Sequence, residues 1–134
     1  MPEFRPRFAA DADDCFTRGY LAAAEWLARF ETGDEADPDT IDNATGWAED
    51  ALAEAVADCK AFQASCQAEI ALYQMLARRG PESAGHDFYL SRNGHGAGFF
   101  DRGDHPTFGY LQDQARAFGS ADAVLCEDGF YRFL

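Results

Sequence analysis

All three histidines of the chain lie in residues 86–105, HDFYLSRNGHGAGFFDRGDH, together with several aspartates and arginines. Imidazole nitrogens and carboxylate oxygens are common metal ligands, and two histidines with one carboxylate form a frequent catalytic set. One interpretation is therefore a small metal-dependent hydrolase with the candidate ligands His86, Asp87, His95 and Asp101. Because their spacing matches no established motif such as H-E-x-x-H, the favoured interpretation assigns no catalytic residue, no metal and no cofactor.

The same stretch also fits a purely structural role. The segments DFYLSR and AGFFDR flank NGHG, and Asn-Gly followed by another glycine is typical of a tight β-hairpin turn. Two registers are open: Asp87 faces Arg102 in one, and His86 faces Asp101 in the other, and opposite charges stabilise either pairing. His95 is the one polar residue that such a hairpin does not require.

The strongest global signal is the net charge of −13. From Glu31 to Asp58 the sequence has ten acidic residues and no basic residue. This field repels nucleic acids and anionic membranes and attracts basic protein surfaces. We therefore expect a protein partner with a basic, nucleic-acid-binding surface, no direct nucleic acid and no membrane. The candidate partner-binding residues are Asp34, Glu35, Asp37, Asp39, Asp42, Glu49, Asp50, Glu54 and Asp58. A merely solvated loop and helix face is the alternative.

Apolar spacing predicts the elements that carry these residues. A first helix is expected over 13–30, a solvated connection over 31–43, and over 47–79 one long helix or two shorter ones with a break. Next come the 87–102 hairpin, a helix that Pro106 opens and Gly119 closes, capped by Asp104, and a second hairpin, AVLC and FYRFL around EDG. The predicted fold is α+β, with a helical hairpin packed on a small antiparallel sheet, in the order α-α-β-β-α-β-β.

The length of 134 residues favours a single domain, 1–134, with a helical acidic part, 1–80, and a second part, 81–134. No apolar run could span a bilayer and no signal peptide is recognisable, which favours the cytoplasm. The four cysteines form no C-x-x-C pair and are expected to be reduced and mostly buried. A long amphipathic helix also allows a homodimer.

The stretch from residue 82 to the end resembles a group of small acidic bacteriophage-encoded proteins with the pattern D-F-W-L-T-R-N-G-H-G-A-G-F-W-D-R and a terminal D-D-G-x-x-Y. Tyr89 and Phe100 stand where that pattern has Trp. The matching residues are Asp87, Phe88, Leu90, Arg92, Asn93, Gly94, His95, Gly96, Ala97, Gly98, Phe99, Asp101 and Arg102. The resemblance implies a mobile-element origin and, as for many small acidic phage proteins, inhibition of a host defence system, as anti-CRISPR and antirestriction factors do. It carries no catalytic role to any residue.

Overall fold

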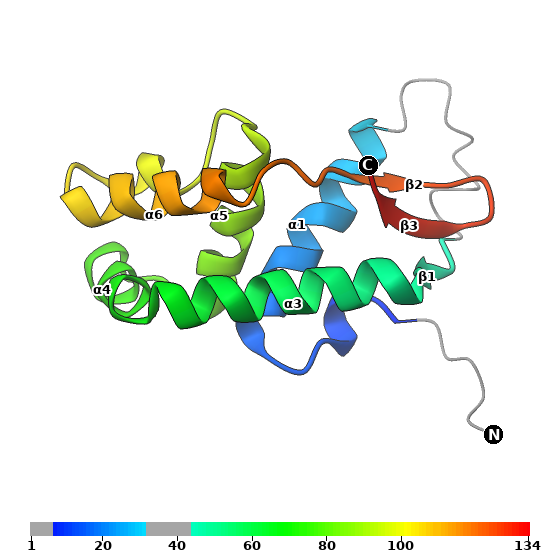
Figure 1. The fold of residues 1–134 in the computed structure, drawn as a ribbon, viewed down its shortest axis with the longest axis horizontal. Coiled ribbons are helices and arrows are strands. Elements are labelled where there is room, and N and C mark those ends of the chain that lie inside the picture. Colours follow the sequence, from blue (N-terminus) through cyan, green and yellow to red (C-terminus); the bar gives the residue numbers. More distant parts are fainter. Residues whose placement is uncertain (1–6, 32–43) are drawn as a thin grey trace.

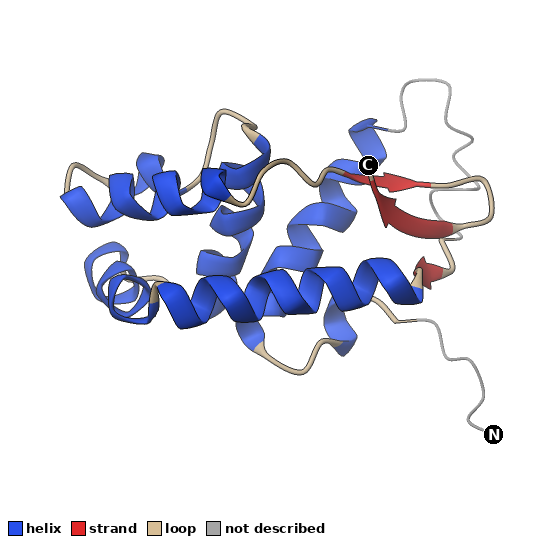
Figure 2. Cartoon of the chain, in the orientation of Figure 1, coloured by secondary structure: helices blue, strands red, loops and turns tan. Residues whose placement is uncertain are grey.

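The computed structural model describes residues 7–31 and 44–134 and is mainly helical, with a small sheet at one end (Figures 1 and 2). The helices are η1 (Ala9–Asp11), α1 (Cys15–Glu31), α3 (Glu49–Ser65), α4 (Gln67–Ala77), α5 (Pro81–Asn93), η2 (Phe99–Arg102) and α6 (Pro106–Ala117), where η marks a 3-10 helix. The strands are β1 (Gly46–Trp47), β2 (Ala123–Leu125) and β3 (Phe130–Phe133). The predicted α+β class with a small sheet is therefore confirmed.

The centre of the molecule is the crossing of α1 and α5, two helices whose backbones touch. A Cβ atom added to Gly19 of α1 would lie 1.9 Å from the carbonyl oxygen of Glu82, and one added to Gly85 of α5 would lie 1.8 Å from that of Phe16. Each helix thus presents a glycine to the other's backbone. Only a residue without a side chain permits such an approach.

Aromatic rings and α3 surround this crossing. Phe88 of α5 stacks on Phe62 of α3, with ring centroids 4.1 Å apart, and packs against Phe16 and Tyr20 of α1. Offset and tilted ring pairs of this kind add stability beyond the area they bury. The chain expected to be helical over 47–79 is two helices, because the backbone at Cys66 leaves helical geometry (φ −120°) and α4 takes a new direction (Figure 1).

The hairpin predicted over 87–102 is wrong. Residues 87–92 belong to α5, and residues 97–102 form a turn and η2. Gly94 does adopt positive φ (66°), but it ends the helix, and the His95 N–H donates to the carbonyl of Leu90 as in a Schellman cap. Asn-Gly suits a hairpin turn and a helix end equally well. Because α5 is buried on nearly every side, no helical periodicity could decide between them.

The sheet is mixed, which corrects the prediction of an antiparallel one. Its order is β1-β3-β2. The predicted C-terminal hairpin is present, with β2 antiparallel to β3, but the other neighbour of β3 is the two-residue strand β1, which runs parallel to it. A strand this short carries no periodic signal in the sequence.

Two smaller expectations are also decided. The first turn of α6 is capped by His105, whose Nδ1 accepts the Thr107 N–H at 3.1 Å, and not by Asp104. All four cysteines are free, but only Cys59 and Cys66 are buried.

Within residues 7–31 and 44–134, no helix combines the length and apolar character needed to cross a membrane.

The glycine crossing yields a stability prediction. Gly85→Ala forces a methyl group onto the Phe16 carbonyl, so we expect the free energy of unfolding to fall by at least about 3 kcal/mol. Gly109→Ala, in α6, is the matched control, because nothing lies within 4 Å of the new Cβ. It should raise stability by roughly 0.5–1 kcal/mol. Urea unfolding measures both, and equal effects would contradict the backbone contact.

Candidate functional site

The predicted acidic surface is described only in part. Five of its residues, Asp34, Glu35, Asp37, Asp39 and Asp42, lie outside the described residues. The other four lie on α3: Glu49, Asp50 and Glu54 are exposed, whereas Asp58 points at Arg92, 2.8 Å away, and its side chain is only 27% exposed. We call Glu49, Asp50 and Glu54 the acidic face. Two of its carboxylates lie in the first turn of α3, where the helix dipole favours negative charge.

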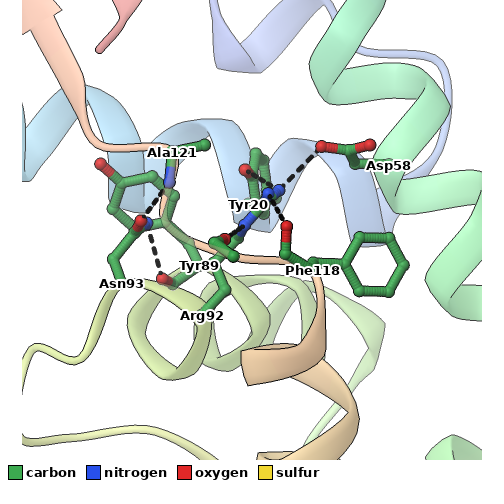
Figure 3. Close-up of polar contacts among 8 residues, drawn as sticks. Tyr20, Asp58, Tyr89, Arg92, Asn93, Phe118 and Ala121 are labelled. Atoms are coloured by element: carbon green, nitrogen blue, oxygen red, sulfur yellow. Dashed lines mark hydrogen bonds and ion pairs between the residues drawn. The ribbon is translucent and has the colours of Figure 1, made fainter.

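Arg92 of the phage-like pattern connects α5 to α1, to α3 and to the end of α6 through hydrogen bonds (Figure 3). Its Nη1 donates to the Tyr20 hydroxyl at 3.1 Å and to Asp58 at 2.8 Å. Its Nε and Nη2 donate to the carbonyls of Gly119 and Phe118, at 2.9 and 3.3 Å. Burial opposes the charged form, but Tyr20 and Asp58 outweigh it and raise the pKa of Arg92. Its guanidinium therefore stays charged, and all three of its nitrogens donate hydrogen bonds inside the protein.

Neighbouring residues of the pattern have similar structural roles. Asn93 donates to the Tyr89 carbonyl at 3.0 Å and accepts the Ala121 N–H at 2.6 Å, which fixes the segment between α6 and β2 against α5 (Figure 3). Gly98, at φ 139°, passes so close to Ser91 that a Cβ would lie 2.2 Å from the hydroxyl oxygen. These contacts close the turn after α5 onto the helix itself.

Asp87 is completely buried and forms a bidentate ion pair with Arg102. Nε and Nη2 of the arginine each lie 2.8 Å from a carboxylate oxygen. The Tyr73 hydroxyl donates a third hydrogen bond at 2.7 Å and also lies 2.9 Å from Ser83 Oγ. Burial, and the bond to Asp87, raise the pKa of Tyr73 to about 12. The pair joins α5 to η2, and three donors from Arg102 and Tyr73 already bind the carboxylate.

The three histidines lie in separate surroundings. His86 is half-buried beside Asp87; burial lowers its pKa, and the nearby Arg102 and Arg79 lower it further, although Asp87 acts in the opposite direction. Its ring is therefore a neutral imidazole at neutral pH.

The role of His95 was not explained by the predicted hairpin. In the structure its side chain holds the C-terminal segment against α5. Its Nε2 lies 2.9 Å from Asp122 Oδ1, and its ring stacks on Tyr89 with centroids 6.0 Å apart. Asp101 is used differently: its carboxylate accepts the Gly98 N–H at 3.2 Å and caps η2. The candidate ligands His86, Asp87, His95 and Asp101 are thus not brought to one point. Nowhere in the described part of the chain do three His, Cys, Asp or Glu residues converge to hold a metal.

The structure also has a hollow of about 530 Å³ between α3 and the N-terminal segment that includes Arg7 and Asp13, which the sequence did not predict. Leu52 and Val56 of α3 contribute apolar side chains to its lining, and Arg7 and Asp13, whose Nη2 and Oδ1 atoms lie 3.7 Å apart, contribute charged ones. The residues lining the hollow are Arg7, Asp13, Trp47, Glu49, Leu52, Ala53, Val56, Ala57 and Lys60. The available signal was a second run of apolar positions on α3, spaced three and four residues apart beside the buried one.

Glu25 fastens the N-terminal wall of this hollow to the sheet. One of its carboxylate oxygens accepts the Ala9 N–H at 2.6 Å and the Trp47 indole N–H at 2.9 Å. Burial raises the pKa of Glu25, although both hydrogen bonds favour the ionised form. The carboxylate thus links η1, α1 and β1 at a cost in desolvation.

Comparisons with protein families, curated proteins and solved structures found no match. The geometry described above is therefore the basis for the functional argument.

The buried ion pair leads to a second prediction. Asp87→Asn leaves Arg102 without its counter-charge and should lower the free energy of unfolding by about 3 kcal/mol or more. Asp128→Asn is the matched control, because Asp128 pairs with Arg132 at the same 2.8 Å but at the surface, where ion pairs contribute little. Chemical denaturation of both variants measures the contrast. A similar loss in both would show that burial does not strengthen the inner pair.

Glu25 leads to a prediction about pH. Because its pKa is raised above 4.5 in the folded state, the folded protein holds this proton more tightly than the unfolded chain. The associated stability is complete below the unfolded pKa and is lost as pH rises through the folded pKa. Glu25→Gln keeps an acceptor oxygen for both donors but cannot ionise.

We therefore expect the stability of Glu25→Gln relative to the unaltered protein to increase as the pH rises from about 4 through the raised pKa of Glu25. Urea unfolding of both proteins at a series of pH values measures this difference. A difference that does not change with pH would contradict the desolvated carboxylate.

Proposed function

We propose that this protein is an inhibitor of a host defence system, carried by a phage or another mobile element, which acts in the host cytoplasm. Its acidic face binds a basic surface on a nucleic-acid-handling protein and blocks that surface. The observation that carries the proposal is that Glu49, Asp50 and Glu54 are exposed on one firmly held helix and form no ion pair with any described residue. The phage-like pattern supports the biological setting.

The acidic face is rigid because α3 is anchored along its whole length. Ala51, Ala55, Cys59 and Phe62 are buried beneath it. Carboxylates fixed in advance lose little conformational entropy when a partner binds, so more of the electrostatic attraction is available for affinity. The Asp58–Arg92 ion pair holds the same helix against α5.

The charge density of the face sets its strength. Asp50 and Glu54 are one helical step of four residues apart, about 6 Å along the axis, whereas one DNA strand carries a charge every 3.4 Å or so. The face therefore imitates a short piece of phosphate backbone at about half its charge density. The net charge of −13 adds long-range attraction, which accelerates encounter with a basic groove and makes association salt-sensitive.

The alternative, a metal-dependent hydrolase, has less support. Asp87 is occupied by Arg102 and Tyr73, and His95 by Asp122. Both side chains would have to abandon bonds that hold the fold together before they could coordinate an ion.

Binding through the acidic face predicts a position-specific effect of charge. Each reversal of an acid to lysine adds two charges, so Asp50→Lys/Glu54→Lys and Asp104→Lys/Asp113→Lys both change the net charge from −13 to −9. All four residues are exposed; Asp50 lies in the first turn of α3, and Asp104 lies two residues before the first residue of α6. The control pair lies at α6.

Pull-down from host lysate first identifies the bound protein, and titration against that purified protein then gives the affinity and its salt dependence. We expect the α3 pair to weaken binding by about 10- to 100-fold and to reduce the salt dependence. The control pair should have less than about a threefold effect. Equal weakening would show that net charge alone attracts the partner, and unchanged binding by the α3 pair would exclude this face as the contact.

A further inference from the structure

The hollow beside α3 exposes an apolar helix face that residues 7–28 and 44–134 leave uncovered. Leu52 and Val56 are only half-buried there, and Ala53 and Ala57 are exposed. A second, smaller hollow of about 250 Å³ continues it along the same helix, between α3 and residues 7–17. The four apolar residues follow one another at intervals of one and three, so they form one stripe on the helix.

Opposite charges lie at the two ends of this stripe. Glu49 stands at its start, and Lys60, which is the only lysine of the sequence, stands at its end. Lys60 follows Glu49 by eleven positions, which corresponds to about 17 Å along the helix. Both side chains are exposed, and neither is in an ion pair with any residue of 7–28 or 44–134.

We propose that this face is the contact between two copies of the chain, with the two α3 helices packed antiparallel about a two-fold axis. In that arrangement Glu49 of each copy meets Lys60 of the second copy, and both ends of the stripe are neutralised at once. Ala53 and Ala57 lie at the middle, where small side chains let two helices approach closely. A two-fold contact requires a self-complementary surface, and this stripe has one.

A second copy fits this face better than an unrelated helix does. An unrelated helix would need a basic residue opposite Glu49 and an acidic residue about 17 Å away, opposite Lys60. A second copy of α3, packed antiparallel, already has both. The proposal goes beyond the inhibitor function. The contact lies on the side of α3 that faces residues 7–17; it includes Glu49, the one residue that it shares with the acidic face, and excludes Asp50 and Glu54.

The contact is short, so the dimer is weak and depends on concentration. A standard interface buries about 800 Å² on each partner, and a stripe of about 17 Å along one helix provides only part of that. Two copies with a net charge of −13 also repel each other. At physiological salt the screening length of about 8 Å limits this repulsion to close distances.

Sedimentation equilibrium at physiological salt tests the proposal, with the protein between about 1 μM and about 1 mM. We expect the unaltered chain to pass from monomer to dimer in this range. Lys60→Glu and Glu49→Lys should each weaken the dimer about tenfold, because each change turns two attractive pairs into repulsive ones. The exchange Glu49→Lys/Lys60→Glu should restore the original dissociation constant within about threefold.

Glu49→Lys separates the pairing from net charge. It changes the net charge from −13 to −11. Weaker repulsion between the copies alone predicts a stronger dimer, whereas the proposed pairing predicts a weaker one. Thermal unfolding of each variant at low concentration, where only monomer is present, checks that the fold is intact. A chain that stays monomeric up to about 1 mM, a dimer strengthened by Glu49→Lys, or an exchange variant that does not recover would each overturn the proposal. The inhibitor test substitutes Asp50 and Glu54 and keeps Glu49, whereas these variants keep Asp50 and Glu54, so failure of one proposal can be told from failure of the other.

Discussion

The close approach of α1 and α5 is the constraint on which the rest of the structure depends. Gly19 and Gly85 bring the two backbones into contact, and the rings of Phe16, Tyr20 and Phe88 then fill the space on either side. Only at this separation does Arg92 reach the Tyr20 hydroxyl. Arg92 in turn orients Asp58 and therefore α3. The position of the acidic face is thus set by a contact deep inside the molecule.

The sequence predicts an element well where that element has one buried face and one solvent-exposed face. Helices α1 and α6 and the β2–β3 hairpin have both, and their patterns locate them correctly. Helix α5 is buried on nearly all sides, so its polar residues look like surface or active-site residues when they are in fact partners of one another. Strand β1 pairs with β3 from far away in the chain, and no local pattern of two residues could indicate that.

The candidate site shows the same limit. A high density of His and Asp in residues 86–105 resembles a ligand set only while the arginines nearby are disregarded. Arg102 and Arg92 each neutralise a carboxylate, Asp87 and Asp58, and the second of these is one of the predicted partner-binding acids. Charge balance inside the fold thus removes residues from both functional interpretations. The exposed acids of α3 remain because no described arginine reaches them.

Helix α3 consequently has three faces of different character: one is buried, one is acidic, and one is apolar with opposite charges at its two ends. Under antiparallel two-fold packing, the residues that flank the stripe on one side come to the same face of the pair. In the proposed dimer, Asp50 and Glu54 of both copies then share one broad acidic surface, longer than that of a single chain.

The glycine crossing also affects how the chain acquires its structure during synthesis. Gly19 and Gly85 are 66 residues apart, which a ribosome adds in roughly 3 to 13 s at 5–20 residues per second. Throughout that interval the aromatic side of α1 has been made but lacks the helix that covers it. Contacts of such long sequence separation form slowly, so the nascent chain exposes Phe16, Tyr20 and Leu21 to chaperones and to other nascent chains before α5 emerges.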